Sequence, residues 1–121
     1  MNLIRTAFTA TIGLILNVTI HSQSYSNDKF VQIQSKTKFI EEVVGRSMTH
    51  ENGHFVVNKN GTWAGLFSGQ SLAGKWKWKN GFWCRTIENS NIKPDCQLWQ
   101  SNGSELLLIR NKGKGKAMMV K

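Results

Sequence analysis

The fold is decided by residues 61–87, which read GTWAGLFSGQSLAGKWKWKNGFWCRTI. This stretch holds four of the five tryptophans (Trp63, Trp76, Trp78 and Trp83), and apolar and polar residues alternate through it, most clearly in Lys75-Trp76-Lys77-Trp78-Lys79. A period of two is typical of a strand with one buried face, because successive side chains leave a strand on opposite sides. Turn-forming residues interrupt the pattern at Ser68-Gly69-Gln70-Ser71 and Asn80-Gly81. The stretch therefore predicts short strands joined by tight turns.

The same pattern extends over most of the chain after Gly45. Asn-Gly occurs four times, and this pair favours hairpin turns because both residues tolerate positive φ. We expect eight strands, at Arg46–His50, His54–Asn58, Thr62–Phe67, Leu72–Lys79, Phe82–Ile87, Cys96–Gln100, Glu105–Arg110 and Lys116–Lys121. Such a chain is mainly β, and it predicts a small antiparallel up-and-down meander or barrel. A two-layer β-sandwich is the alternative.

One short helix is predicted before the strands, over Lys38–Val44. Ser35 or Thr37 is placed to cap its start, and Gly45 suits its end. We expect this helix to plug one end of a barrel or to cover an open sheet edge. The preceding residues, Tyr25–Ser35, alternate weakly and predict a lead-in segment or a first edge strand.

The turn at Asn80-Gly81 allows two registers. As a two-residue loop it places Trp78 opposite Trp83 and Trp76 opposite Arg85; as a three-residue loop with Lys79 it places Trp78 opposite Phe82 and Trp76 opposite Cys84. A slip of one residue exchanges the two faces of a strand. We favour the three-residue loop, because it separates apolar from charged residues better. It gathers Trp76, Trp78, Phe82 and Cys84 on the inner face and leaves Lys75, Lys77, Lys79, Trp83 and Arg85 on the outer face. The other register would put Arg85 among three indoles, as an anchor for an anionic ligand.

The related segments Lys59-Asn60-Gly61-Thr62-Trp63 and Lys79-Asn80-Gly81-Phe82-Trp83 suggest that one hairpin solution is used twice. A three-residue loop in the first segment aligns five residues on one face: Phe55, Val57, Trp63, Gly65 and Phe67.

The N-terminal residues 1–24 predict a signal peptide. Arg5 precedes an apolar run from Ala7 to Ile20, and Ser22-Gln23-Ser24 suits cleavage before Tyr25. Cleavage would leave one domain, residues 25–121, which loses only Arg5 among the charged residues and carries 15 basic and 7 acidic side chains, a net charge of +8. A secreted or periplasmic location follows, with no transmembrane span after cleavage; a retained N-terminal anchor is the alternative.

Cys84 and Cys96 are the two cysteines of the chain. Export predicts that they form a disulfide, which would stabilise a small domain by about 3 kcal/mol. The other interpretation is a pair of metal-binding thiolates, but neither histidines nor a second cysteine pair lie at zinc spacing. We expect no metal and no cofactor.

Two basic clusters are candidate ligand-binding sites. The first combines Lys75, Lys77, Lys79 and Arg85 with Trp83, an arrangement suited to a polyanion; solvated strand positions are the simpler interpretation. The second is Lys112-Gly113-Lys114-Gly115-Lys116, where glycines let backbone N–H groups approach an anion. It does not match a P-loop, and a soluble hairpin turn is its simpler interpretation.

Catalytic motifs are weak. His50, Glu51 and His54 spell H-E-x-x-H, but Asn52-Gly53 predicts a turn where the zinc-protease motif needs a helix. The chain has no Gly-x-Ser-x-Gly elbow, and its seven carboxylates show no spacing for paired acid–base work. We name no catalytic residue.

Four motifs stand out together between residues 39 and 116: Gly45-Arg46, Gly74-Lys75-Trp76-Lys77-Trp78-Lys79-Asn80-Gly81-Phe82-Trp83-Cys84-Arg85, Cys96 and Gly113-Lys114-Gly115-Lys116. On these residues the stretch resembles a group of small secreted bacterial proteins. Members of this group are often labelled dihydrodipicolinate reductase. That reaction needs a dinucleotide-binding fold with G-x-G-x-x-G opening a helix. Only six residues follow Gly115, too few for that helix, so the resemblance implies the family but not the reaction.

Three hypotheses about function follow from the sequence. The first is an exported, non-enzymatic β-barrel module that binds an anionic envelope or extracellular component through Lys75, Lys77, Lys79, Trp83, Arg85, Lys112, Lys114 and Lys116. The second is a carrier with a small ligand inside the barrel, lined by Trp76 and Trp78 and, in the other register, Arg85. The third is an enzyme. The expected partner is a polyanion or an anionic small molecule, not nucleic acid, and the oligomeric state is left open.

Overall fold

The computed structural model describes residues 13–15 and 29–121. The predicted cleavage site and most of the predicted signal peptide lie outside these residues, so both remain predictions. In the part of the chain that is described, no helix has the length and apolar character to cross a membrane.

The described residues form nine strands and two short helices. They are β1 (Val31–Gln32), α1 (Lys36–Glu42), β2 (Met48–His50), β3 (Gly53–Val57), β4 (Thr62–Phe67), β5 (Gln70–Lys79), β6 (Phe82–Arg85), β7 (Asp95–Ser101), β8 (Leu106–Ile109), α2 (Arg110–Gly113) and β9 (Ala117–Val120). The eight predicted strands correspond to β2 through β9, and each bound differs from the prediction by at most two residues. The mainly β fold class is thus confirmed.

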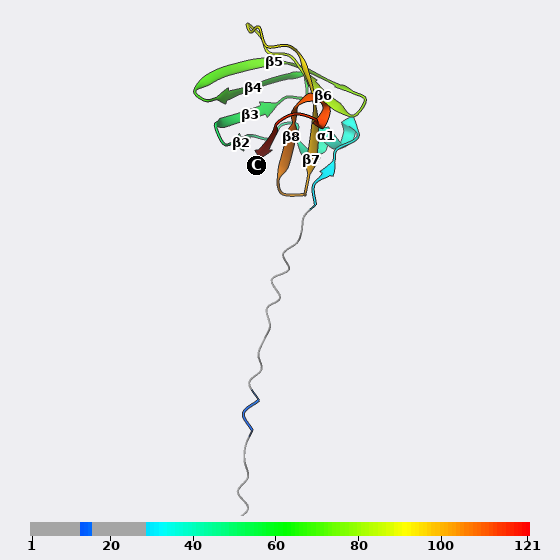
Figure 1. The fold of residues 1–121 in the computed structure, drawn as a ribbon, viewed down its shortest axis with the longest axis vertical. Helices are drawn as coiled ribbons and strands as arrows, with labels where there is room; N and C mark the ends of the chain where they lie inside the picture. The colour runs from blue at the N-terminus through cyan, green and yellow to red at the C-terminus, as the bar shows by residue number, and fades with distance from the viewer. Residues whose placement is uncertain (1–12, 16–28) are drawn as a thin grey trace, which may run out of the picture.

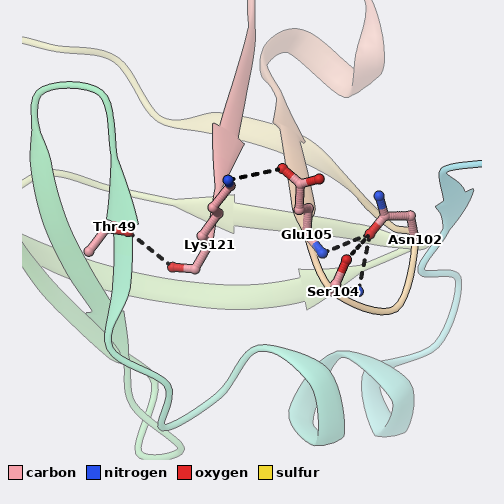
Figure 2. A network of polar contacts seen from close by, with 5 residues as sticks. All are labelled: Thr49, Asn102, Ser104, Glu105 and Lys121. Atoms are coloured by element: carbon pink, nitrogen blue, oxygen red, sulfur yellow. Dashed lines mark hydrogen bonds and ion pairs between the residues drawn. The ribbon is translucent and has the colours of Figure 1, made fainter. Parts of the chain in front are cut away.

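The strands form one antiparallel meander in the order β2-β3-β4-β5-β6-β7-β8-β9 (Figure 1). Thr49 of β2 and Lys121, just after β9, exchange both backbone hydrogen bonds, with N···O distances of 2.7 and 3.0 Å. The Oγ1 of Thr49 also donates to the carbonyl of Lys121 at 3.4 Å (Figure 2). This seam brings the first and last strands of the meander together, so the sheet is a nearly closed barrel rather than a sandwich.

The edge segment β1 pairs with β7 at Val31–Ser101 and Gln32–Gln100, in line with the predicted first edge strand. Helix α1 begins two residues earlier than predicted, and the Oγ of Ser35 accepts a hydrogen bond from Lys38 N at 3.1 Å as its N-cap. Figure 1 shows α1, in cyan, close to β7. Its Phe39 is fully buried, as expected of a helix that plugs one end of the barrel.

Aromatic rings fill this end of the barrel. The ring of Phe39 lies 5.4 Å from that of Trp76, 4.9 Å from Trp78 and 5.8 Å from Trp99, measured between centroids. The inward orientation of Trp76 and Trp78 is therefore confirmed, while Lys75, Lys77 and Lys79 between and beside them are exposed.

The first hairpin has the predicted register, with Val57 opposite Trp63 and Phe55 opposite Gly65. The register favoured for the second hairpin is wrong. Trp78 lies opposite Trp83 and Trp76 opposite Arg85, so Asn80-Gly81 is a two-residue turn. Its φ angles of 50° and 84° are the positive values that this turn requires.

The two similar segments therefore use different loops. In the first, the Oδ1 of Asn60 accepts hydrogen bonds from both N and Oγ1 of Thr62, at 3.2 and 2.6 Å, which holds a three-residue loop. The second has Phe82 in place of Thr62 and makes no such bond in the described structure. As a consequence, Trp83 and Arg85 face the interior, whereas Phe82 and Cys84 face outward with the lysines of β5.

Gly74 shows how closely the interior is packed around the tryptophans. The indole of Trp63 on β4 lies over Gly74 of β5, and its Nε1 donates to the carbonyl of Thr86, just after β6, at 2.9 Å. A Cβ atom on Gly74 would lie 2.7 Å from this Nε1 and closer still to the Thr86 carbonyl. The position opposite Trp63 has to be glycine.

The predicted disulfide between Cys84 and Cys96 is present. The two residues are directly opposite each other on β6 and β7, with a Cα–Cα distance of 3.9 Å. The bridge lies on the outer face of the barrel, because the neighbours of Cys84 on β6, Trp83 and Arg85, point inward.

Candidate ligand-binding site

A cavity of about 600 Å³ lies in the barrel at the end opposite α1. The two ends of β3 show that α1 and the cavity are at opposite ends of the barrel. At the C-terminal end of β3, the carbonyl of Val57 accepts a hydrogen bond from the N–H of Gly45, just after α1. At its N-terminal end, Glu51 and Asn52 of the preceding turn line the cavity. No residue of α1 lines it. Its volume falls within the range of small-molecule sites.

The walls of the cavity are mostly apolar and come from six strands, β3, β4, β5, β6, β8 and β9, and from the connection between β6 and β7. They are formed by Phe55, Trp63, Phe67, Leu72, Trp83, Ile87, Ile92, Leu108 and Met118. The indoles of Trp63 and Trp83 lie edge to face, with centroids 6.3 Å apart, and Trp83 packs in the same way on Trp99 at 5.8 Å. These contacts explain why Trp83 faces the interior, because its indole packs there against two other aromatic side chains.

Arg85 is the one charged residue among the buried residues of the described chain; it is 9% exposed and lines the cavity. Its Nη1 donates to the carbonyl of Lys93 at 3.3 Å. Two ion pairs are found in the described residues, Lys38–Glu42 and Lys121–Glu105, and neither includes Arg85. A guanidinium has five N–H donors, so most of the hydrogen-bonding capacity of Arg85 is unused by the protein.

The natural partner for Arg85 would be Asp95, which lies directly opposite it on β7. The Asp95 carboxylate binds elsewhere: Asn111 N donates to its two oxygens at 3.2 and 3.4 Å, and Gln97 Nε2 donates to Oδ2 at 2.9 Å. Burial lowers the pKa of Arg85, the negative charge of Asp95 raises it in part, and the positive charge of Arg110 lowers it further. Arginine remains cationic at neutral pH in spite of such a shift, so the cavity wall carries a positive charge that is not neutralised by an ion pair.

Two further N–H groups on cavity-lining residues are buried and have no partner among the described residues: Nε1 of Trp83 and Nε2 of His50. The Nδ1 of His50 accepts a hydrogen bond from Asn52 N at 3.2 Å, so the neutral imidazole carries its proton on Nε2. His50 also stacks on Phe67, with centroids 4.6 Å apart. Both atoms have almost no accessible surface, so a ligand in the cavity would not reach them, and the cost of their missing hydrogen bonds belongs to the packing of the interior.

The rim of the cavity is basic. Arg110, Lys116 and Lys121 line it, and Glu51 is the one carboxylate residue among the lining residues. Lys121 is partly engaged, because its Nζ lies 3.8 Å from Oε2 of Glu105 (Figure 2). With Arg85, the cavity holds four cationic side chains against one acidic side chain.

The structure separates the residues that the sequence grouped into the first basic cluster. Lys75, Lys77 and Lys79 are exposed on the outer face of β5, as expected. Trp83 and Arg85 are not on that face: Trp83 is 2% exposed and both residues line the cavity. The predicted outer patch therefore lacks the aromatic ring and the arginine assigned to it. Trp76 and Trp78, expected beside an interior ligand, pack on Phe39 instead.

The second basic cluster forms the turn between β8 and β9. The backbone N–H of this turn that approaches an anion is that of Asn111, and the anion is the carboxylate of Asp95 within the same chain. Lys112 and Lys114 are exposed, and Nζ of Lys112 lies 5.9 Å from the ring centroid of Phe82 on the outer face. Lys116 alone of the three lysines lines the cavity.

The H-E-x-x-H letters span the turn between two strands. His50 on β2 pairs with Gly53, and His54 on β3 pairs with Thr49, so the histidines are not paired with each other. His50 is half-buried and lines the cavity, whereas His54 is exposed on the other face of the sheet. They do not share a metal site.

Sequence reasoning missed His50, Gln97 and Arg110 as members of a site. Their only signal was charge or polarity beside apolar strand residues, which many solvated positions share. Comparisons of the chain with protein-family models, with curated proteins and with solved structures found no match.

Proposed function

We propose that the protein binds a small organic anion inside its barrel, with the anionic group on Arg85 and the apolar part of the ligand against the aromatic walls. The observation that carries the proposal is the state of Arg85: this residue is 9% exposed, lines a cavity of about 600 Å³ and lacks an ion pair within the described residues. Burying a charge without a partner is expensive, so a ligand that supplies the partner is favoured.

This is the hypothesis of a carrier with a small ligand inside the barrel, but the residues that line the site are Trp83 and Arg85 rather than Trp76 and Trp78. It is favoured over binding on the outer lysine face, because Trp83 and Arg85 are inside and cannot take part in an outer patch. We also propose that the protein works outside the cytosol, since structural disulfides such as Cys84–Cys96 persist in oxidising compartments.

A matched pair of dyes tests the proposal. Anilinonaphthalene sulfonate and N-phenylnaphthylamine share one fluorophore, but only the first carries a sulfonate. We expect the purified domain to bind the sulfonate more tightly, and Arg85→Met to remove this preference. A charge-assisted hydrogen bond is worth about 1.5–3 kcal/mol, so the sulfonate should lose roughly 10- to 150-fold in affinity.

The control is Lys77→Met, which removes a positive charge from the exposed face of the neighbouring strand. It should leave both dyes unaffected. Equal loss of sulfonate binding in Arg85→Met and Lys77→Met would mean that net charge, rather than the interior arginine, attracts the dye, and the proposal would be wrong.

A further inference from the structure

A second arginine stands at the same cavity as Arg85. Arg110 begins the turn between β8 and β9, is exposed at the rim, and lines the cavity with Arg85. The two positive charges are near enough to disfavour each other, since the charge of Arg110 contributes to lowering the pKa of Arg85. No ion pair in the described structure involves either of them. Two like charges around one cavity form a favourable arrangement only when an anion lies between them.

The backbone at Arg110 is fixed rather than free. Arg110 N donates to the carbonyl of Lys116 at 3.1 Å, and Gly115 N donates to the carbonyl of Arg110 at 2.9 Å. The next residue, Asn111, is tied through its N–H to Asp95 on β7. Gly115 itself lies so close that a Cβ there would be 3.0 Å from the Cβ of Arg110. These contacts place Arg110 at the rim on the same side as the β7 wall.

Asp95 thus has two effects on the site. It holds the turn that carries Arg110, and in doing so its carboxylate is committed to Asn111 and Gln97 rather than to Arg85. Both arginines remain available to one ligand. The other cations are less available or less suited: Lys121 is close to Glu105, and a lysine ammonium binds as a single point charge, whereas a guanidinium offers paired donors that match the oxygens of a phosphate.

We propose that the anionic group of the ligand is a phosphate monoester, held between Arg85 inside the cavity and Arg110 at its rim, with the apolar part of the ester against Trp63, Trp83 and Phe55. This inference rests on the proposed function and deepens it, since a phosphate monoester carries nearly two negative charges at neutral pH and three acceptor oxygens. A carboxylate or sulfonate has one negative charge and would neutralise the charge of only one of the two arginines.

The test compares naphthyl phosphate with naphthalene sulfonate by calorimetry on the disulfide-bonded domain. Both ligands carry the same ring and differ in the charge of the head group. At about pH 8 we expect the phosphate to bind about tenfold more tightly, and at about pH 5, below the second pKa of the ester near 6, the two to bind alike. Protonation of the protein affects both ligands, so the ratio of their affinities isolates the second charge of the phosphate.

Two variants locate the effect. Arg110→Gln should remove the preference for the phosphate and weaken the sulfonate much less than the phosphate, whereas Arg85→Met should weaken both ligands. Lys112→Gln is the matched control, because Lys112 belongs to the same turn but lies over Phe82 on the outer face; it should change neither affinity.

Each result is decisive. Sulfonate binding that depends on Arg85, with no extra affinity for the phosphate, keeps the proposed function and overturns the inference. A phosphate preference that survives in Arg110→Gln also overturns it. Failure of both ligands to bind refutes the proposed function itself. Inorganic phosphate is the third ligand: if it binds as tightly as the ester, the site is one for free phosphate, and the assignment of an ester with an apolar body is wrong.

Discussion

Arg85 and Asp95 lie directly opposite each other on β6 and β7, yet the carboxylate of Asp95 accepts its hydrogen bonds from Asn111 and Gln97. The charges of the two residues still influence each other, because the negative charge of Asp95 raises the pKa of Arg85 in part. This relationship leaves a cation on the cavity wall whose field is weakened but not cancelled. Asp95 should therefore lower the affinity of the cavity for an anion.

Asp95→Asn should increase the affinity of the domain for anilinonaphthalene sulfonate by about threefold, because a negative charge near the binding arginine is removed. The amide oxygen of asparagine can still accept from Asn111 N, so the turn should keep its place. A fluorescence titration measures the change, with the neutral N-phenylnaphthylamine as the control that should not respond. Weaker binding of the sulfonate would contradict the arrangement described for Arg85.

Arg85→Met should leave the ligand-free domain at least as stable as the wild type, and by up to about 1–2 kcal/mol more stable. Burial is the main cause that lowers the pKa of Arg85, so the charged form is less favourable in the folded protein than in water. For a basic group, a folded-state pKa below the unfolded one makes the charged form destabilising at every pH below that pKa. The cost is therefore present throughout the neutral range, and removing the charge relieves it.

Urea denaturation at neutral pH measures this effect, with Lys75→Met on the exposed face of β5 as the control that should change little. A loss of more than about 2 kcal/mol in Arg85→Met would show that the arginine holds the barrel together, as a typical destabilising substitution would.

The register of the second hairpin makes Trp83 and Phe82 an informative pair. Trp83→Ala should cost about 3–5 kcal/mol, since it empties a buried site between Trp63 and Trp99. Phe82→Ala should cost much less, because Phe82 is half-exposed on the outer face. Thermal and denaturant unfolding of both variants provide the comparison; the opposite ranking is the outcome expected of the three-residue loop.

Gly74→Ala should destabilise the domain by several kcal/mol, as overpacking does at its upper end. The added methyl group would collide with the carbonyl of Thr86 and press on the Trp63 indole that crosses above it. Ala73→Ser, at the exposed neighbouring position, is the matched control. Similar unfolding midpoints for the two variants would show that the Trp63 indole does not pack over Gly74.

Replacing both Cys84 and Cys96 by serine should lower stability by about 3 kcal/mol, because the bridge closes a loop with a sequence separation of 12 residues. The bridge is on the outer face, so the affinity for the dye should be kept wherever the variant is folded. Loss of binding in a domain that is still folded by circular dichroism would place the bridge in the site instead.

The sequence by itself determined the strands and turns of this protein. The period of two in residues 61–87 and the repeated Asn-Gly pairs are local properties, and a strand alternates its faces whatever lies next to it. The short capped helix and the disulfide were also predictable, because Ser35, Gly45 and the two cysteines act through their own chemistry.

The tertiary structure alone decided which face of β6 is inside. Asn80-Gly81 fits either loop, and separating apolar from charged residues favoured the register that the barrel does not use. That reasoning considered one hairpin, whereas the choice depends on Trp63 and Trp99, which come from other strands and pack on Trp83. It placed Arg85 on the outer face and kept the inward arginine as the alternative, whereas Arg85 faces a cavity. A cavity has no local signature, because it exists only where distant strands leave space between them.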